Sequence, residues 1–185
     1  MKLLSLVFSF KNEEENLNEL VNRVDQVFQK IENWNYELIF VNDNSSDNSE
    51  KILLDLQKKF PIILINMSRT FGVSPCVLAG LRNVNGECAI YMDTDLQDPP
   101  EIIPNLIKEY ENGNDVVHTL RLKRLGENRF KILITKFAYK IINYFSDIDL
   151  PIECGDFKLI SKKVLNIITN QKEFDPYIRG LSVWA

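Results

Sequence analysis

The sequence predicts an α/β fold in which a mostly parallel sheet is covered by helices on both faces. Short apolar runs alternate with amphipathic segments of helical period through roughly the first two thirds of the chain. Each apolar run is short and is followed by polar turn residues, which is typical of buried strands in such a sheet. A chain of 185 residues is long enough for one domain with a sizeable core.

Two strand–helix units are expected in residues 3–60. The first strand is residues 3–10, and Asn12 is expected to cap the following helix, whose first turn carries three glutamates at its positive end. The second strand is residues 37–41. After the polar turn 42–49, Asp47 or Ser46 is expected to cap a helix that runs to Phe60. The apolar stripe of the first helix has a period of 3.6 residues and consists of Leu17, Leu20, Val21, Val24, Val27, Phe28 and Ile31.

Three further strands are expected at residues 62–65, 88–92 and 116–120. Helices at residues 72–84 and 100–110 connect them, the second of which starts at a proline pair and ends at Gly113. Because strands and helices alternate in this order, the strands are expected to pair in parallel with helices on both faces of the sheet.

The character of the chain changes after Leu120. A basic cluster surrounds Gly126 and consists of Arg121, Lys123, Arg124, Arg129 and Lys131. A long helix is expected at residues 129–145, with polar residues on one face and a broad apolar surface elsewhere. Two interpretations remain open: the helix packs on the core with a solvated basic stripe, or it lies on an anionic membrane surface.

The last part of the chain contains a further strand and a helix. Asp156 lies between a glycine and the apolar residues of the strand, and a helix is expected at about residues 161–170. The chain ends on Ser-Val-Trp-Ala, in mid-pattern and without a polar tail. This ending predicts that the chain is a piece of a longer protein that lacks its C-terminal segments.

Composition excludes several classes of protein. The apolar content of 45% and charged content of 26% are those of an ordinary globular protein, and the net charge of −4 disfavours nucleic acid as a partner. The three cysteines are widely spaced and do not cluster with the single histidine, which disfavours a zinc site or a disulfide framework and fits a reducing compartment. The sequence has no apolar run of 18 residues and no signal peptide pattern.

The strongest chemical signal is a pair of aspartates at the end of an apolar run. Asp93 and Asp95 directly follow the strand expected at 88–92, and alternate residues of a strand share one face. Two hard oxygen donors at the carboxyl end of a buried strand suit Mg²⁺ or Mn²⁺ that carries a diphosphate. The alternative is that both aspartates only cap the helix that starts at Pro99 and Pro100.

Six segments stand out in chain order: Ser9-Phe-Lys-Asn-Glu-Glu-Glu-Asn-Leu17, Val41-Asn-Asp-Asn-Ser-Ser-Asp-Asn-Ser49, Ser68-Arg-Thr-Phe-Gly72, Asp93-Thr-Asp-Leu-Gln-Asp-Pro-Pro100, Gly155-Asp-Phe157 and Arg179-Gly-Leu-Ser182. Together they resemble the inverting family-two glycosyltransferases, and most of all the polyprenyl-phosphate (dolichyl-phosphate-type) hexosyltransferases. The resemblance covers essentially all of the chain. It implies the GT-A fold, which is Rossmann-like, and a single catalytic domain whose residues 1–121 bind the nucleotide sugar and whose residues 122–185 face the acceptor.

The resemblance implies a donor site in two loops. The loop after the first strand, with Ser9, Lys11 and Glu13, would hold the nucleobase and ribose. The loop after the second strand, with Val41 and Asp43, would bind the base. In the family the first segment usually reads Pro-x-Tyr-Asn-Glu, so an aromatic residue is replaced here by Lys11. The usual Asp-Asp pair of the second segment reads Asn-Asp here, and both changes leave the base open between uracil and guanine.

The resemblance also implies the metal ligands and the catalytic residues. Asp93 and Asp95 would hold Mg²⁺ or Mn²⁺ with the donor diphosphate, and Gln97 would complete the metal shell. Arg121 resembles a family arginine near the diphosphate or the acceptor phosphate. Asp156 occupies the place of the family's acceptor-side carboxylate, so Asp156, Asp95 and Arg121 are the expected catalytic residues.

The leading hypothesis is an enzyme that moves a hexose from a UDP- or GDP-sugar to a polyprenyl phosphate at the cytoplasmic face of a membrane. A bound cation would stabilise the departing nucleoside diphosphate, and the basic cluster would hold the acceptor phosphate. Two alternatives remain: a glycosyltransferase with a saccharide acceptor, and a nucleotide-sugar-binding fragment without turnover. A homo-oligomer is possible because the expected apolar helix needs cover. A dinucleotide-binding oxidoreductase is disfavoured because no GxGxxG follows the first strand.

Overall fold

The computed structural model describes residues 1–120, 154–173 and 176–185. In these residues a six-stranded sheet has the order β3-β2-β1-β4-β6-β5. The strands are β1 (Lys2–Phe10), β2 (Trp34–Asn42), β3 (Ile62–Asn66), β4 (Cys88–Tyr91), β5 (Val116–Leu120) and β6 (Cys154–Ser161). The pairs β1·β2, β2·β3 and β1·β4 are parallel, as the alternation of strands and helices predicts.

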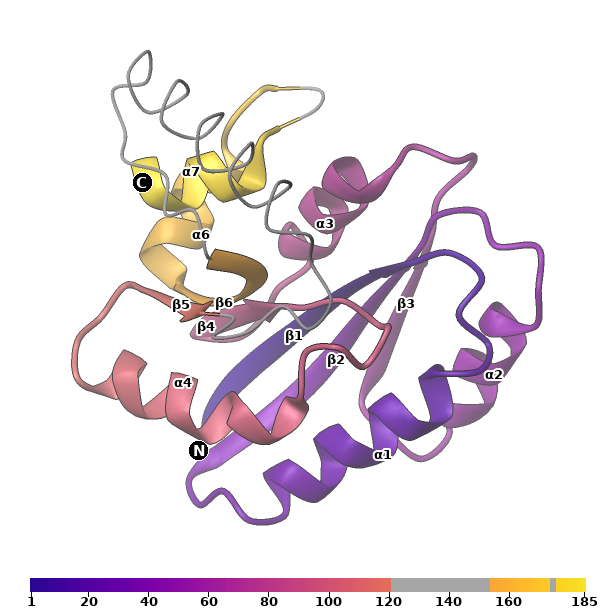
Figure 1. Ribbon diagram of the computed structural model, residues 1–185, viewed down its shortest axis with the longest axis horizontal. Coiled ribbons are helices and arrows are strands. Elements are labelled where there is room, and N and C mark those ends of the chain that lie inside the picture. The colour runs from indigo at the N-terminus through magenta and orange to yellow at the C-terminus, as the bar shows by residue number, and fades with distance from the viewer. Residues whose placement is uncertain (121–153, 174–175) are drawn as a thin grey trace, which may run out of the picture.

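Helices cover both faces of the sheet, which confirms the predicted fold class (Figure 1). On one face lie α1 (Leu17–Phe28), α2 (Ser49–Leu56), the 3₁₀ turn η1 (Pro100–Ile102) and α4 (Ile103–Glu111). On the other face lie α3 (Val73–Leu81), α6 (Lys162–Thr169) and α7 (Ile178–Trp184). Alternate strand residues enter the two cores: Phe8 and Phe40 belong to the first, and Val7 and Val41 belong to the second.

The order of elements reveals the place of neither β5 nor β6. β6 runs antiparallel to both of its neighbours and lies between β4 and β5, so the pairing of β5 with β6 is antiparallel and not parallel as expected. Phe157 and Leu159 point into the first core, whereas Ile160 points into the second. A strand from late in the chain therefore completes the sheet that the first 120 residues begin.

The predicted start of the first helix at Asn12 is wrong, because α1 begins at Leu17. Asn12 has a φ of 58°, in the left-handed region, so it does not lead directly into a helix. Its side-chain oxygen instead accepts a hydrogen bond from the backbone N–H of Ser46 at 2.8 Å. The asparagine thus links two loops rather than capping the helix that follows it.

The second helix is also shorter than predicted. It spans Ser49–Leu56 and does not reach Phe60. Of the two proposed caps, Asp47 does accept a hydrogen bond from the N–H of Ser49 at 3.0 Å, whereas Ser46 contacts Asn12. Asp47 also accepts from the N–H of Glu14 at 3.1 Å, so it holds the turn before α1 against the start of α2.

The helix predicted at 129–145 and the basic cluster that begins at Arg121 lie outside the described residues. Among the helices that the structure does describe, none is both long enough and apolar enough to cross a membrane.

Candidate active site

Three parallel strands end at the same edge of the sheet, and the loops that follow them form the candidate site. β1 ends at Phe10, β2 at Asn42 and β4 at Tyr91, and β1 lies between the other two. Ligands of open α/β sheets bind at the carboxyl ends of the strands, where such loops meet. The polar residues singled out from the sequence follow these three strand ends.

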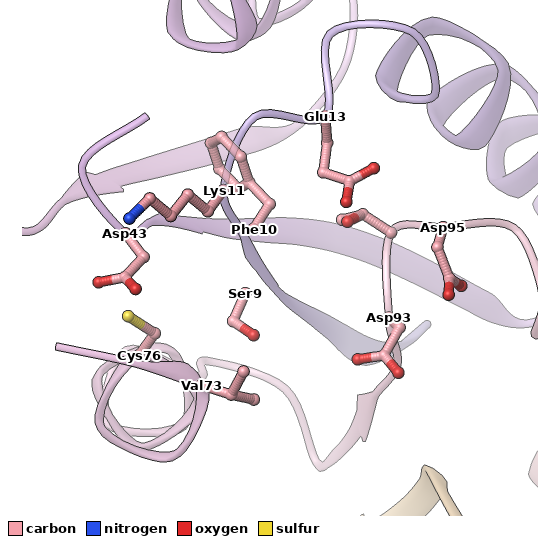
Figure 2. Close-up of a pocket in the computed structure, with 10 residues that line it drawn as sticks. Ser9, Phe10, Lys11, Glu13, Asp43, Val73, Cys76, Asp93 and Asp95 are labelled. Atoms are coloured by element: carbon pink, nitrogen blue, oxygen red, sulfur yellow. The ribbon is translucent and has the colours of Figure 1, made fainter. Parts of the chain in front are cut away.

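A pocket of about 210 Å³ opens between these loops and the start of α3 (Figure 2). It contains six of the residues expected to bind the donor or its metal, namely Ser9, Lys11, Glu13, Asp43, Asp93 and Asp95. Phe10, Val73, Cys76 and Thr94 complete the lining. We call this cavity the donor pocket. In Figure 2, Asp43 and Cys76 lie at one end of it, and Asp93 and Asp95 lie at the other.

Asp43 fixes one end of the donor pocket. It is buried, and its two carboxylate oxygens accept hydrogen bonds from the backbone N–H groups of Phe71 at 2.6 Å and Gly72 at 3.0 Å. Gly72 has a φ of 89°, which a residue with a side chain rarely adopts. The neighbouring Thr70 accepts a hydrogen bond from Lys11 Nζ at 3.0 Å. Asp43 therefore holds the loop before α3 beside the pocket.

The loop after β1 is fixed by the loop after β2. The N–H of Asn12 donates to Ser45 Oγ at 3.0 Å, and the N–H of Glu13 donates to Ser49 Oγ at 2.9 Å. The Glu13 carboxylate accepts a hydrogen bond from Asn16 Nδ2 at 2.7 Å. Because both of its ends are held, Glu13 is oriented along the donor pocket before any ligand binds.

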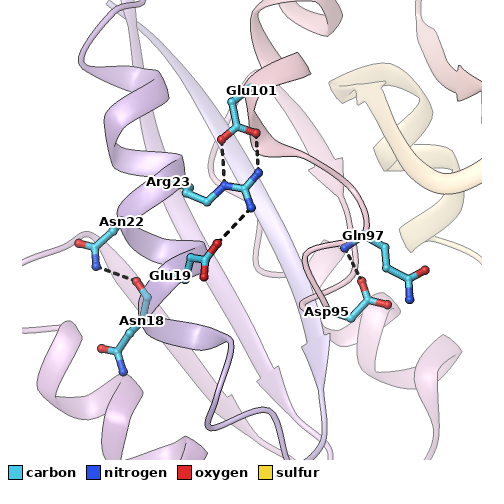
Figure 3. A network of polar contacts seen from close by, with 7 residues as sticks. All are labelled: Asn18, Glu19, Asn22, Arg23, Asp95, Gln97 and Glu101. Atoms are coloured by element: carbon cyan, nitrogen blue, oxygen red, sulfur yellow. Dashed lines mark hydrogen bonds and ion pairs between the residues drawn. The ribbon is translucent and has the colours of Figure 1, made fainter.

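Asp93 and Asp95 follow β4 in a tight turn. Asp93 is half-buried, and Asp95 is exposed. Asp95 Oδ1 accepts a hydrogen bond from the backbone N–H of Gln97 at 3.1 Å, and Leu96 between them has a φ of 61° (Figure 3). The Gln97 side chain is exposed and is not among the pocket residues. The turn thus orients Asp95 through the backbone of Gln97.

An ion pair next to this turn joins α1 to η1. Arg23 Nε and Nη2 donate to the two carboxylate oxygens of Glu101 at 2.9 and 2.7 Å (Figure 3). The hydrogen bond from the Arg23 guanidinium lowers the pKa of Glu101. The pair holds the segment that follows Asp95 against α1, where a bidentate geometry is favourable.

The donor set fits a hard divalent cation. In the described residues no group of three or more His, Cys, Asp and Glu side chains is arranged as a metal site. Mg²⁺ is often held by only one or two carboxylates together with the oxygens of a substrate phosphate. Asp93 and Asp95 supply that number of carboxylates at one end of the donor pocket.

Val41, a further predicted site residue, does not line the donor pocket. Val41 has no exposed surface, and its side chain packs in the second core, so it can only contribute its backbone to a ligand. Arg121 lies outside the described residues. The position of Val41 follows from the alternation of β2, in which its neighbours Phe40 and Asn42 face the other way.

Asp156 lines a second cavity, of about 230 Å³, next to the donor pocket. The two cavities share Val73. Arg179 of α7 donates to both oxygens of Asp156, from Nε at 3.3 Å and from Nη2 at 2.8 Å. The other residues that line this second cavity come from β4, α3 and the start of α7, namely Ser74, Val77, Tyr91, Tyr177 and Ile178. We call this cavity the Asp156 pocket.

Several residues of these pockets have no role predicted from the sequence. Arg179 belongs to the segment Arg179-Gly-Leu-Ser182, which resembles the family, but its pairing with Asp156 is a long-range contact. Cys76 of the donor pocket is buried. Burial, with a contribution from the Asp43 carboxylate, raises the pKa of the Cys76 thiol to about 12. The thiol is therefore protonated at neutral pH and is a poor nucleophile.

A family model described as "Glycosyl transferase family 2" matches residues 5–168. "Uncharacterized glycosyltransferase YkcC" of Bacillus subtilis is 38% identical over 182 residues, which are 98% of this chain and 56% of the relative. "Bactoprenol glucosyl transferase" of Shigella phage SfV is 34% identical over 183 residues, which are 98% of this chain and 59% of the relative. The chain therefore spans less than two thirds of the length of these relatives.

Solved structures with similar folds carry nucleotide sugars. TarS 1–349 of S. aureus in complex with UDP-GlcNAc has a TM-score of 0.66 and 16% identity, and the match covers 100% of this chain and 53% of that chain. Glucosyl-3-phosphoglycerate synthase of Mycobacterium tuberculosis, in complex with Mn²⁺, UDP-glucose and phosphoglyceric acid, has a TM-score of 0.64 and 16% identity, with 90% and 59% covered. At such identity the likeness concerns the fold alone.

Proposed function

The chain belongs to glycosyl transferase family 2 and has the GT-A fold, and on this premise we propose that it is the catalytic part of a hexosyltransferase. The donor would be a UDP- or GDP-hexose, and the acceptor would be a polyprenyl phosphate at the cytoplasmic face of a membrane. The relatives named bactoprenol glucosyl transferase support this class of acceptor.

The observation that carries the proposal is the convergence of six site residues on the donor pocket. Those residues come from the ends of three strands that are far apart in the sequence, and each belongs to a segment that resembles the family. Asp43, with Lys11 beside it, would bind the base. Asp93 and Asp95, at the opposite end, would face the diphosphate (Figure 2).

A divalent cation fits this arrangement. Asp93 and Asp95 would hold Mg²⁺ or Mn²⁺, and the cation would stabilise the negative charge that develops on the departing nucleoside diphosphate. Asp95 is oriented for this task by the N–H of Gln97. We therefore assign to Gln97 a supporting backbone contact, and its side chain remains a predicted metal ligand.

The Asp156 pocket would receive the acceptor. It adjoins the donor pocket at Val73, so an acceptor there would reach the sugar from the side of Asp156. Attack on the anomeric carbon from the face opposite to the departing diphosphate would invert its configuration. A hydroxyl acceptor needs a general base, for which Asp156 is suited, whereas a phosphate acceptor is already anionic and needs charge screening. Arg179 beside Asp156 would supply part of that screening, and Arg121 is the further basic residue proposed for it.

Two other functions make different predictions. An enzyme with a saccharide acceptor would use the same donor pocket but would not transfer to a prenyl phosphate. A binding protein without turnover would bind the nucleotide sugar and release no nucleoside diphosphate. Product analysis with each acceptor separates these from the leading proposal.

The first test is calorimetric titration of UDP, UDP-glucose and GDP-mannose, each with and without Mn²⁺. We expect one nucleotide to bind only with the metal, and the Asp95→Ala variant to bind it at least about tenfold more weakly, since a lost charge-assisted contact is worth about 1.4 kcal/mol or more. Asp55→Ala is the matched control, because Asp55 is an exposed aspartate of α2 whose partner is Lys58.

Transfer to a short-chain polyprenyl phosphate is then measured with the nucleotide sugar that binds. Metal-independent binding that Asp95→Ala leaves unchanged would contradict the proposed donor site. Binding without transfer by this chain, together with transfer by a version extended to the length of its relatives, would place the missing requirement outside residues 1–185.

A further inference from the structure

Tyr91 stands between the two pockets. It is the last residue of β4, is 5% exposed and lines the Asp156 pocket. Its phenol is a hydrogen-bond partner of the Ser9 hydroxyl, and Ser9 lines the donor pocket. The hydroxyl pair therefore extends from one cavity to the other through their common wall.

Val73 of α3 marks the same boundary, because it is the residue that lines both cavities. Figure 2 shows Ser9 and Val73 next to each other, between the end of the pocket that holds Asp43 and the end that holds Asp93. At 59% exposed, the Val73 side chain leaves this boundary accessible from outside.

The Ser9–Tyr91 pair leaves one O–H group for a ligand. Each hydroxyl has one proton to donate and lone pairs that accept. One hydrogen bond between the two side chains uses one of the two protons, so the other can be donated to an oxygen of a ligand at the common wall of the two cavities.

We propose that the transferred hexose binds at this boundary and that Tyr91 positions it by donating a hydrogen bond to one of its oxygens. The inference rests on the proposed function. The hexose is attached to a diphosphate beside Asp93 and must be attacked from the side of Asp156, so its ring has to lie where the two pockets meet. A sugar carries hydroxyls that both donate and accept, and the Ser9–Tyr91 pair offers it groups of the same kind.

The test compares the binding of a free nucleotide with the binding of the corresponding nucleotide sugar. It uses the Tyr91→Phe variant, which keeps the aromatic ring and removes only the hydroxyl. The dissociation constants of UDP and UDP-glucose are measured with Mn²⁺, or those of GDP and GDP-mannose if the guanine pair is the one that binds. We expect the value for the free nucleotide to change less than about twofold. The dissociation constant of the nucleotide sugar divided by that of the free nucleotide should rise about threefold to tenfold. This is the change expected when one hydrogen bond is lost.

Two further variants separate positioning from structural damage. Tyr36→Phe is the control, because it removes a hydroxyl that lines neither pocket and donates to Asp25 at 2.6 Å. This variant should leave the ratio unchanged. Ser9 lines the donor pocket, so Ser9→Ala should weaken both ligands, but the sugar nucleotide more than the free nucleotide. The same ratio therefore provides the test if Tyr91→Phe does not fold.

The outcomes are distinct. An unchanged ratio in Tyr91→Phe, or weaker binding of both ligands by the same factor, overturns the role of Tyr91 and leaves the proposed function standing. If the wild-type protein binds neither member of either pair, the proposed function fails, and the inference fails with it.

Discussion

Asp43 has two roles at the donor pocket. Its carboxylate accepts the backbone N–H groups of Phe71 and Gly72, and it also lines the cavity beside Lys11 and Cys76. A carboxylate oxygen has two lone pairs, so each oxygen that accepts one N–H can accept a second donor from a ligand. A residue expected from the sequence to bind the base is therefore also the residue that holds the pocket's loop in place.

We predict that Asp43→Asn destabilises the protein and weakens nucleotide binding. The amide retains one acceptor oxygen and turns its NH₂ group toward a backbone N–H, so one buried bond is lost at a cost of about 1–3 kcal/mol. Urea denaturation measures the free energy of unfolding, and calorimetry measures the dissociation constant, which should rise at least about fivefold. Asp55→Asn on the surface should change neither quantity. If Asp43→Asn behaves like this control, the loop is held by other contacts.

At the scale of elements, α3 joins the sheet to both pockets. Its first residue, Val73, lines both cavities, and its last turn contains Gly80, which packs on β1 and β2. A Cβ at position 80 would lie 2.4 Å from Val7 Cγ1 and 3.1 Å from Val41 Cγ2. The glycine thus lets the helix approach the sheet, and this close approach sets where the helix begins beside the site.

We predict that Gly80→Ala destabilises the protein by about 1–3 kcal/mol, because the added methyl group overpacks a well-filled core. The free energy of unfolding is measured for Gly80→Ala, Val7→Ala and the double variant. The double variant should be more stable than the sum of the single effects implies, since Val7→Ala removes the atom that the new methyl group meets. Strict additivity would show that α3 moves away from the sheet instead.

At the scale of the whole molecule, the sheet is assembled from both parts of the chain. β6 pairs with β4 through the register Cys88↔Ser161 to Tyr91↔Lys158, and with β5 on its other edge. Its residues fill both cores, so neither core is complete without it. The predicted division of the chain at residue 121 into a donor half and an acceptor half therefore does not separate two independent cores.

We predict that a protein cut to residues 1–121 does not fold into a cooperative monomer. Without β6, one edge of β4 is unpaired, and an unpaired strand edge favours association with other chains. Size-exclusion chromatography and near-ultraviolet circular dichroism, with the 185-residue chain as the reference, measure association and tertiary packing. A monomer with cooperative urea unfolding would contradict the prediction.

Local patterns in the sequence were sufficient for much of the fold and for the donor pocket. Apolar runs identify the strands β1, β2, β3 and β5, and an apolar stripe identifies the helix α1. The spacing of apolar residues follows from which side chains each element buries, so it can be recognised in the sequence. The aspartates after β4 and the polar residues after β1 and β2 could be assigned to one edge of the sheet, because parallel strands end on the same side. Family membership followed from the same short segments.

The tertiary structure alone decided which distant residues meet. Asn12 could be expected to cap a helix, but a hydrogen bond to the loop of Ser46 holds it in a left-handed conformation. The pairing of Asp156 with Arg179 depends on β6 and α7 reaching the edge of β4. The contact of Ser9 with Tyr91 depends on the pairing of β1 with β4. A sequence pattern records that a residue is buried or lies at a strand end, but it does not record its neighbour. Neighbours are set by the order and register of the strands, which result from packing the whole chain at once.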